Sequence, residues 1–167
     1  MTTGRTPAQS RITITRLMTA GDANLHGNIH GGVIMKLVDD AAGIAASRHS
    51  GGRAVTVSMD EMVFLVPVHV GDLVYAHAGI NWAGRTSMEI GVRVEAERWD
   101  EIGERVHTSS AYLAYVGLDG HGKPRRVPEV VCEDDTERRR FREAEIRREA
   151  RLARRKAIVA ARGGQED

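Results

Sequence analysis

The stretch VIMKLVDDAAGIAASRH, residues 33–49, decides the fold. On a helix with 3.6 residues per turn its apolar side chains lie on almost every side, and it is long enough for four turns. Gly51 or Gly52, just beyond it, suits the left-handed residue that closes many helices. Because a helix that is apolar all round must be surrounded by protein, the sequence predicts a buried central helix.

The segment before this helix has a different pattern. Residues 12–18, ITITRLM, alternate and contain β-branched side chains, which indicates a strand. The next stretch, MTAGDANLHGNIHGG, is rich in Gly, Asn and His, which indicates a structured loop. A strand and a loop are therefore expected to lead into the helix.

Alternation with a period of two dominates the chain after the helix. In SMEIGVRVEAE, Met88 and Ile90 share one face while Glu89 and Arg93 share the other, which predicts a half-buried strand. Similar runs cover about 54–66, 71–83 and 104–118. The order of elements predicts an α+β fold class, an antiparallel β-sheet wrapped around one central α-helix. Its long edge strands favour pairing with a second copy of the chain.

The last part of the chain has its own charge pattern. Residues 133–162 hold 11 basic and 7 acidic residues, whereas residues 1–132 hold 13 basic and 14 acidic ones. The tail is dense in Arg, Glu and Ala with few apolar residues, which predicts a charged, solvated helix. We therefore expect a flexible N-terminus (1–11), one folded domain (12–132) and a charged helical C-terminal extension (133–167).

Composition argues against several classes of partner. The net charge is only +1 and aromatic residues make up 4%, so no nucleic-acid partner is expected. No apolar run approaches the ~20 residues that cross a bilayer, so no membrane partner is expected either. The single cysteine, Cys132, and the lack of an apolar signal core in MTTGRTPAQSR favour a cytoplasmic protein.

Two adjacent acids on the central helix point in different directions, because neighbours on a helix are about 100° apart. Asp39 shares a stripe with Gly32, Met35, Gly43 and Ala46, whose small members would let another backbone approach. Asp40 lies one turn after Lys36 and is expected to form a solvated ion pair with it. An alternative left open is that Asp39 caps a loop or pairs with Lys36.

The sequence HGG, residues 30–32, opens the helix, where backbone N–H groups can stabilise an oxyanion. The alternative for such a glycine pair is an ordinary tight turn. His26 and His30 lack further ligands at a usual spacing, so we expect no metal and no cofactor.

Covalent catalysis by a serine or cysteine has no support in the sequence. No serine lies in a G-x-S-x-G elbow, and Cys132 has no obvious His partner. The remaining groups are a helix carboxylate, Asn24 and Asn28 in the loop, and the helix-start amides. These groups suit base-assisted attack of water on an acyl carbon.

The segment DANLHGNIHGGVIMKLVDDAAGIAASRH resembles the acyl-CoA thioesterases of the hotdog fold, in particular the cytosolic acyl-CoA hydrolase branch with its short bacterial relatives. The resemblance continues through VTVSMDEMVFLVPVHVGDLV, GRTSMEIGVRVEAE and SSAYLAYVGLDGHGKPRRVPEVV, and covers about residues 12–145. It implies a hotdog fold, a homodimer that assembles further as a trimer of dimers, and an acyl-CoA substrate that is hydrolysed to a carboxylic acid and CoA.

The same resemblance implies roles for three residues. Asp39 corresponds to the helix carboxylate that acts as general base or nucleophile, Asn24 to the loop amide that places the water or the carbonyl, and Gly31 to the oxyanion-hole amide. At ~1.5 Å rise per residue, Asp39 and Gly31 are about 12 Å apart on one helix. This separation predicts that Asp39 of one chain acts with Asn24 and Gly31 of the other.

Two basic clusters are candidates for the CoA phosphates. One is Arg85, Thr86 and Ser87 in the turn GRTS, and the other includes Arg126 in GKPRR. The alternative for each is a solvated turn charge.

Two other functions remain as alternatives. A non-catalytic acyl-CoA-binding sensor of this fold would need an output domain, and the charged tail shows no helix-turn-helix pattern. A hydratase of this fold should carry Asp and His five residues apart on the helix, but the residue five after Asp39 is Ile44.

Overall fold

The computed structural model describes residues 4–101 and 103–163. Its order of helices and strands confirms the predicted α+β class. The elements are η1 (Pro7–Gln9), β1 (Ile12–Leu17), η2 (Ala20–Asp22), α1 (Gly31–Ser50), β2 (Ala54–Phe64), β3 (Asp72–Ala83), β4 (Ser87–Arg98), β5 (Val106–Gly117) and α2 (Asp135–Ala161).

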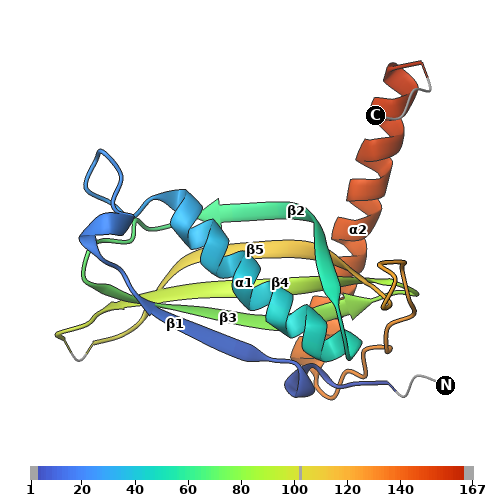
Figure 1. Ribbon diagram of the computed structural model, residues 1–167, viewed down its shortest axis with the longest axis horizontal. Helices are drawn as coiled ribbons and strands as arrows, with labels where there is room; N and C mark the ends of the chain where they lie inside the picture. The colour runs from blue at the N-terminus through green and yellow to red at the C-terminus, as the bar shows by residue number, and fades with distance from the viewer. Residues whose placement is uncertain (1–3, 102, 164–167) are drawn as a thin grey trace.

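The strands form one antiparallel sheet in the order β1-β3-β4-β5-β2, and α1 crosses one face of it (Figure 1). Alternate side chains of β3 and β4, such as Val74, Ala76 and Ile90, point to α1 and are fully buried. The buried positions of α1, among them Val38 and Ala45, complete this core. The predicted buried helix is therefore confirmed, and β1 and β2 are the edges of the sheet.

Both ends of α1 have specific caps. The helix begins at Gly31, two residues before the predicted start, and the Nδ1 atom of the preceding His30 accepts a hydrogen bond from the Gly32 N–H at 3.0 Å. It ends at Ser50 and is capped by Gly51, whose φ of 72° is left-handed, so Gly51 is the one of the two candidate glycines that closes the helix.

The first described residues do not behave as the flexible N-terminus that the sequence predicts. Pro7 and Ser10 are buried, and the Arg5 N–H donates to the Glu129 carbonyl at 2.8 Å. The Arg5 guanidinium also donates to the His49 carbonyl at the end of α1. Residues 4–11 thus pack against the end of α1, while residues 1–3 of the predicted segment lie outside the described part.

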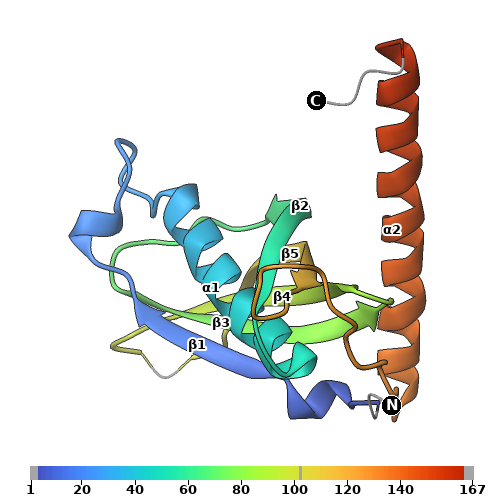
Figure 2. The same cartoon turned by 45° about the vertical axis from the view of Figure 1, so that its right-hand side comes forward.

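The charged C-terminal segment is a helix, but its first half is not a solvated appendage. Figure 2 shows α1 and α2 on opposite faces of the sheet. Ala144, on α2 itself, is fully buried, and Arg147 of the same helix binds Glu89 of β4. The sequence places Glu89 on a solvated face, yet it is only 3% exposed because α2 covers it. The last residues of the predicted extension, 164–167, fall outside the described part.

Neither helix, as far as the chain is described, combines the length and apolar character needed to cross a membrane.

Candidate active site

Asp39 is half-buried where α1 passes over β2 and β5. Its Oδ1 atom accepts a hydrogen bond from Thr56 Oγ1 at 2.7 Å and another from Tyr115 Oη at 2.8 Å. Thr56 and Tyr115 are partners across the β2–β5 ladder, so the sheet brings both hydroxyls to one oxygen. In the described part of the chain, Oδ2 has no hydrogen-bond partner, and Asp39 lines an open hollow beside β2.

The neighbouring acid behaves as predicted. Lys36 Nζ lies 2.7 Å from Asp40 Oδ2, and both side chains are exposed. The alternative pairing of Lys36 with Asp39 is therefore wrong. The prediction that Ala46 lies on the same stripe as Asp39 is also wrong, because Ala46 is fully buried in the core.

Asn24 and Gly31 lie at a second hollow of about 340 Å³, which also includes Asn28 and apolar residues such as Phe64. The Asn24 Oδ1 atom accepts from the His26 N–H at 2.8 Å, which fixes the loop as an Asx turn. His30 takes up the amides of Gly32 and Val33, whereas the Gly31 N–H has no partner among the described residues. The hollow thus combines a free helix-start amide with apolar walls.

The two hollows have no lining residue in common. Asp39 lines one, while Asn24 and Gly31 line the other. A single chain therefore does not bring the three predicted catalytic residues together.

The predicted phosphate-binding residues lie at the β3–β4 turn and the loop after β5. The Val127 N–H donates to the Arg85 carbonyl at 3.1 Å, which holds this turn beside Arg126. The side chains of Arg85 and Arg126 are exposed, and Thr86 and Ser87 are half-buried. None of these four residues lines either hollow.

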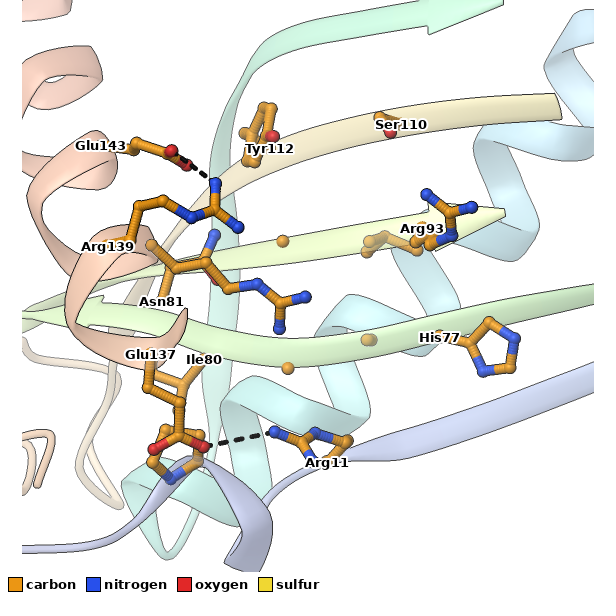
Figure 3. A pocket seen from close by; sticks show the side chains of 16 residues that line it. Arg11, His77, Ile80, Asn81, Arg93, Ser110, Tyr112, Glu137, Arg139 and Glu143 are labelled. Atoms are coloured by element: carbon orange, nitrogen blue, oxygen red, sulfur yellow. Dashed lines mark hydrogen bonds and ion pairs between the residues drawn. The ribbon is translucent and has the colours of Figure 1, made fainter. Parts of the chain in front are cut away.

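A third hollow, of about 510 Å³, lies on the opposite face of the sheet beside the start of α2 (Figure 3). Arg11, His77, Arg93 and Tyr112 are among its lining residues. None of the catalytic or phosphate-binding residues predicted from the sequence lines this hollow. Its place across the sheet from Asp39 separates it from the candidate active site.

Thr56 and Tyr115 are the site residues that the sequence analysis missed. Both lie in alternating strands, where a Thr and a Tyr are ordinary strand residues. Only the pairing of β2 with β5 reveals that they meet at Asp39.

Comparison with known proteins gives the family. The family model for the thioesterase superfamily matches residues 26–101. A Bacillus subtilis protein named as an uncharacterized acyl-CoA thioester hydrolase is 38% identical over 129 residues, which cover 77% of this chain and 74% of that protein. The chain belongs to the thioesterase superfamily. The mouse cytosolic acyl coenzyme A thioester hydrolase is 37% identical over 143 residues, but these cover 85% of this chain and only 38% of the mouse protein.

Solved structures agree with this thioesterase assignment. An acyl-CoA hydrolase from Staphylococcus aureus, in complex with butyryl coenzyme A and coenzyme A, superposes with a TM-score of 0.86 at 33% identity, covering 94% of this chain and 95% of that one. A hexameric acyl-CoA thioesterase gives a TM-score of 0.87 at 34% identity, covering 91% and 97%. Other structures of the S. aureus enzyme carry alanine in place of an aspartate, an asparagine or a threonine.

Proposed function

We propose that this thioesterase hydrolyses acyl-CoA to a carboxylic acid and CoA. The observation that carries the proposal is the Asp39 carboxylate at an open hollow. Two hydroxyls fix one of its oxygens, and the other has no partner among the described residues. A fixed carboxylate with one available oxygen suits the activation of water or direct attack on a carbonyl. The acyl-CoA hydrolases among its structural neighbours support the substrate class.

In the proposed reaction, Asp39 acts as general base or as nucleophile. As a base, it takes a proton from water while the water oxygen bonds to the thioester carbonyl carbon. The Gly31 N–H stabilises the negative charge that develops on the carbonyl oxygen, and Asn24 places the water or the carbonyl. The carbon–sulfur bond then breaks, and the departing CoA thiolate takes up the proton.

The separation of the two hollows leads us to propose a homodimer with composite sites. β2 is an edge strand, and Val57 on it is 57% exposed. Met35 and Ile44 add exposed apolar surface on the neighbouring side of α1. Pairing of two copies through this surface would bury it and bring Asp39 of one protomer towards Asn24 and Gly31 of its partner. The hexameric neighbour supports further assembly of such dimers into a trimer of dimers.

Arg85, Thr86, Ser87 and Arg126 are proposed to bind the phosphates of CoA. Their support is the backbone hydrogen bond that holds the two basic segments together. We place the reaction in the cytoplasm, in line with the cytosolic relative.

Mixing two inactive variants tests the composite site. Asn24→Ala and Asp39→Asn chains are combined, and subunit exchange is confirmed by mass spectrometry. Random exchange makes half of the dimers mixed, and each mixed dimer has one intact site, so about a quarter of wild-type activity is expected. Absence of recovery would place both residues in the site of one chain.

The substrate is tested with acyl-CoAs from acetyl to palmitoyl. The wild-type protein should hydrolyse some of them, with release of free CoA. Binding of acyl-CoA without any hydrolysis would favour the alternative of a non-catalytic sensor.

A further inference from the structure

Tyr115 is the largest side chain that the fold buries completely, and it still carries a polar atom. It lies on the core face of β5 and is only 1% exposed. A phenylalanine would fill this space without a polar atom to satisfy. The Tyr115 hydroxyl therefore needs a partner, and it finds that partner on Asp39 of α1.

The contact between Tyr115 and Asp39 spans the packing between helix and sheet. Tyr115 Oη lies 2.8 Å from Asp39 Oδ1 and 3.1 Å from the Asp39 carbonyl oxygen. Burial raises the pKa of the Tyr115 phenol, and the Asp39 carboxylate beside it raises this pKa further. The phenol thus keeps its proton and remains a hydrogen-bond donor at neutral pH.

A second hydroxyl acts on the same oxygen from the next strand. Thr56 Oγ1 donates to Asp39 Oδ1 at 2.7 Å, and Thr56 is the cross-strand partner of Tyr115. Two donors from two strands fix the rotation of the carboxylate about its Cβ–Cγ bond. This arrangement satisfies Oδ1 and leaves Oδ2 available.

We propose that Tyr115 is a positioning residue that orients the Asp39 carboxylate so that Oδ2 faces the reacting atoms. This inference rests on the proposed thioesterase function. In this role Tyr115 acts through Asp39, to which its hydroxyl is bonded. Thr56 also orients the Asp39 carboxylate through its hydrogen bond to Oδ1, but Thr56 is exposed. Tyr115, in contrast, is held in place by the core around it.

Tyr115→Phe tests the proposal, because it removes one oxygen and keeps the ring. A hydrogen bond to a charged group is lost, so kcat for an acyl-CoA should fall roughly 10- to 100-fold. KM and the Kd for CoA should stay within about twofold of wild type, since no substrate contact is removed. The midpoint of urea unfolding checks that the fold is intact.

Tyr112→Phe is the matched control. Tyr112 lies three residues earlier on β5 but on the opposite face of the sheet, at the hollow beside α2 (Figure 3). There the Arg147 guanidinium stacks on its ring. The same oxygen is removed from the same strand, and kcat should not change. Thr56→Val is a second test at the same carboxylate oxygen and should also lower kcat with little effect on KM.

Three results would overturn the positioning role. The first is an unchanged kcat in Tyr115→Phe. The second is a fall in kcat that comes with an equal loss of CoA affinity and a lower urea midpoint, as a purely structural residue would give. The third is a double variant, Tyr115→Phe with Thr56→Val, that is slower than Asp39→Asn. A wild-type protein without hydrolase activity would instead refute the proposed function itself, and an active Asp39→Asn variant would refute the role proposed for Asp39.

Discussion

The two long helices lie on opposite faces of one sheet and are held there by different forces. α1 is buried mainly by apolar contacts, and its exposed side carries Asp39 and Asp40. α2 has few apolar side chains and is held by ion pairs to the outer face, such as Arg147 with Glu89 and Arg151 with Asp60. The sheet thus separates the candidate chemistry from the C-terminal anchor. Changes in α1 at Asp39 should alter turnover, and changes in α2 should alter stability.

The largest effect is expected at Asp39. Asp39→Asn removes the proposed base or nucleophile, so kcat should fall by roughly 10³-fold. The fold should persist, because the asparagine still accepts hydrogen bonds from Thr56 and Tyr115. Asp40→Asn is the control, since Asp40 forms only an exposed pair with Lys36. Equal losses of kcat in both variants would contradict the assignment.

Arg147→Ala should change stability and leave turnover intact. Arg147 binds both oxygens of Glu89, at 2.6 and 3.1 Å, and Asn81 donates to the same carboxylate. Loss of the arginine leaves a buried carboxylate without its cation, which should lower the free energy of unfolding by about 3 kcal/mol.

Arg139→Ala is the control for Arg147→Ala, because its pair with Glu143 is much more exposed. Urea unfolding measures the difference between the two variants. A large fall in kcat for Arg147→Ala with normal stability would contradict the assignment of turnover to α1 and stability to α2.

A smaller effect is expected from the basic turns. Arg85→Ala and Arg126→Ala should each raise KM for acyl-CoA about tenfold if a phosphate contact worth ~1.4 kcal/mol is lost. The same acyl group on a short pantetheine that lacks the nucleotide provides the comparison. An equal rise of KM for both substrates would show that these side chains do not recognise the nucleotide.

The last of these effects concerns the pH dependence of stability and His49 in α1. His49 is fully buried, and burial lowers its pKa even though its Nε2 atom bonds the Pro128 carbonyl at 3.1 Å. The folded protein therefore takes up the proton at lower pH than the unfolded chain, whose histidine pKa is about 6.5. The free energy of unfolding should thus decrease as the pH falls from about 7.5 to about 5.5, with a slope of at most ~1.4 kcal/mol per pH unit from this residue.

Replacement of His49 checks this origin of the pH dependence. His49→Gln should flatten the slope, whereas His121→Gln, at an exposed loop position, should not. Urea unfolding at several pH values measures both variants. An unchanged slope in His49→Gln would assign the pH dependence to other groups.

Local periodicity was sufficient to predict most of the fold. The helix over 33–49 and the alternation in 87–97 each depend on neighbours in the chain, so their patterns are visible in the sequence. Helix geometry also separated Asp39 from Asp40, and the pair of Asp40 with Lys36 confirms that prediction.

Contacts between distant elements were not predictable in this way. The meeting of Thr56 and Tyr115 depends on the β2–β5 register, which shifts just after Thr56. The alternation in β4 predicts a solvated Glu89, but α2 covers this residue. The high charge of α2 in turn predicts a solvated helix that does not contact the sheet. These features depend on which elements pair across long stretches of chain.

The length of α2 beyond Arg151 determines how the protein will respond to proteases. Residues 152–161 follow Arg151 and extend for about 15 Å at ~1.5 Å per residue, and in both ribbon views α2 rises past the sheet (Figure 2). Arg154 and Lys156 are exposed on this part of the helix. Under limiting trypsin, the first cuts should therefore fall there. The remaining core, with Arg147 still bound to Glu89, should resist digestion much longer.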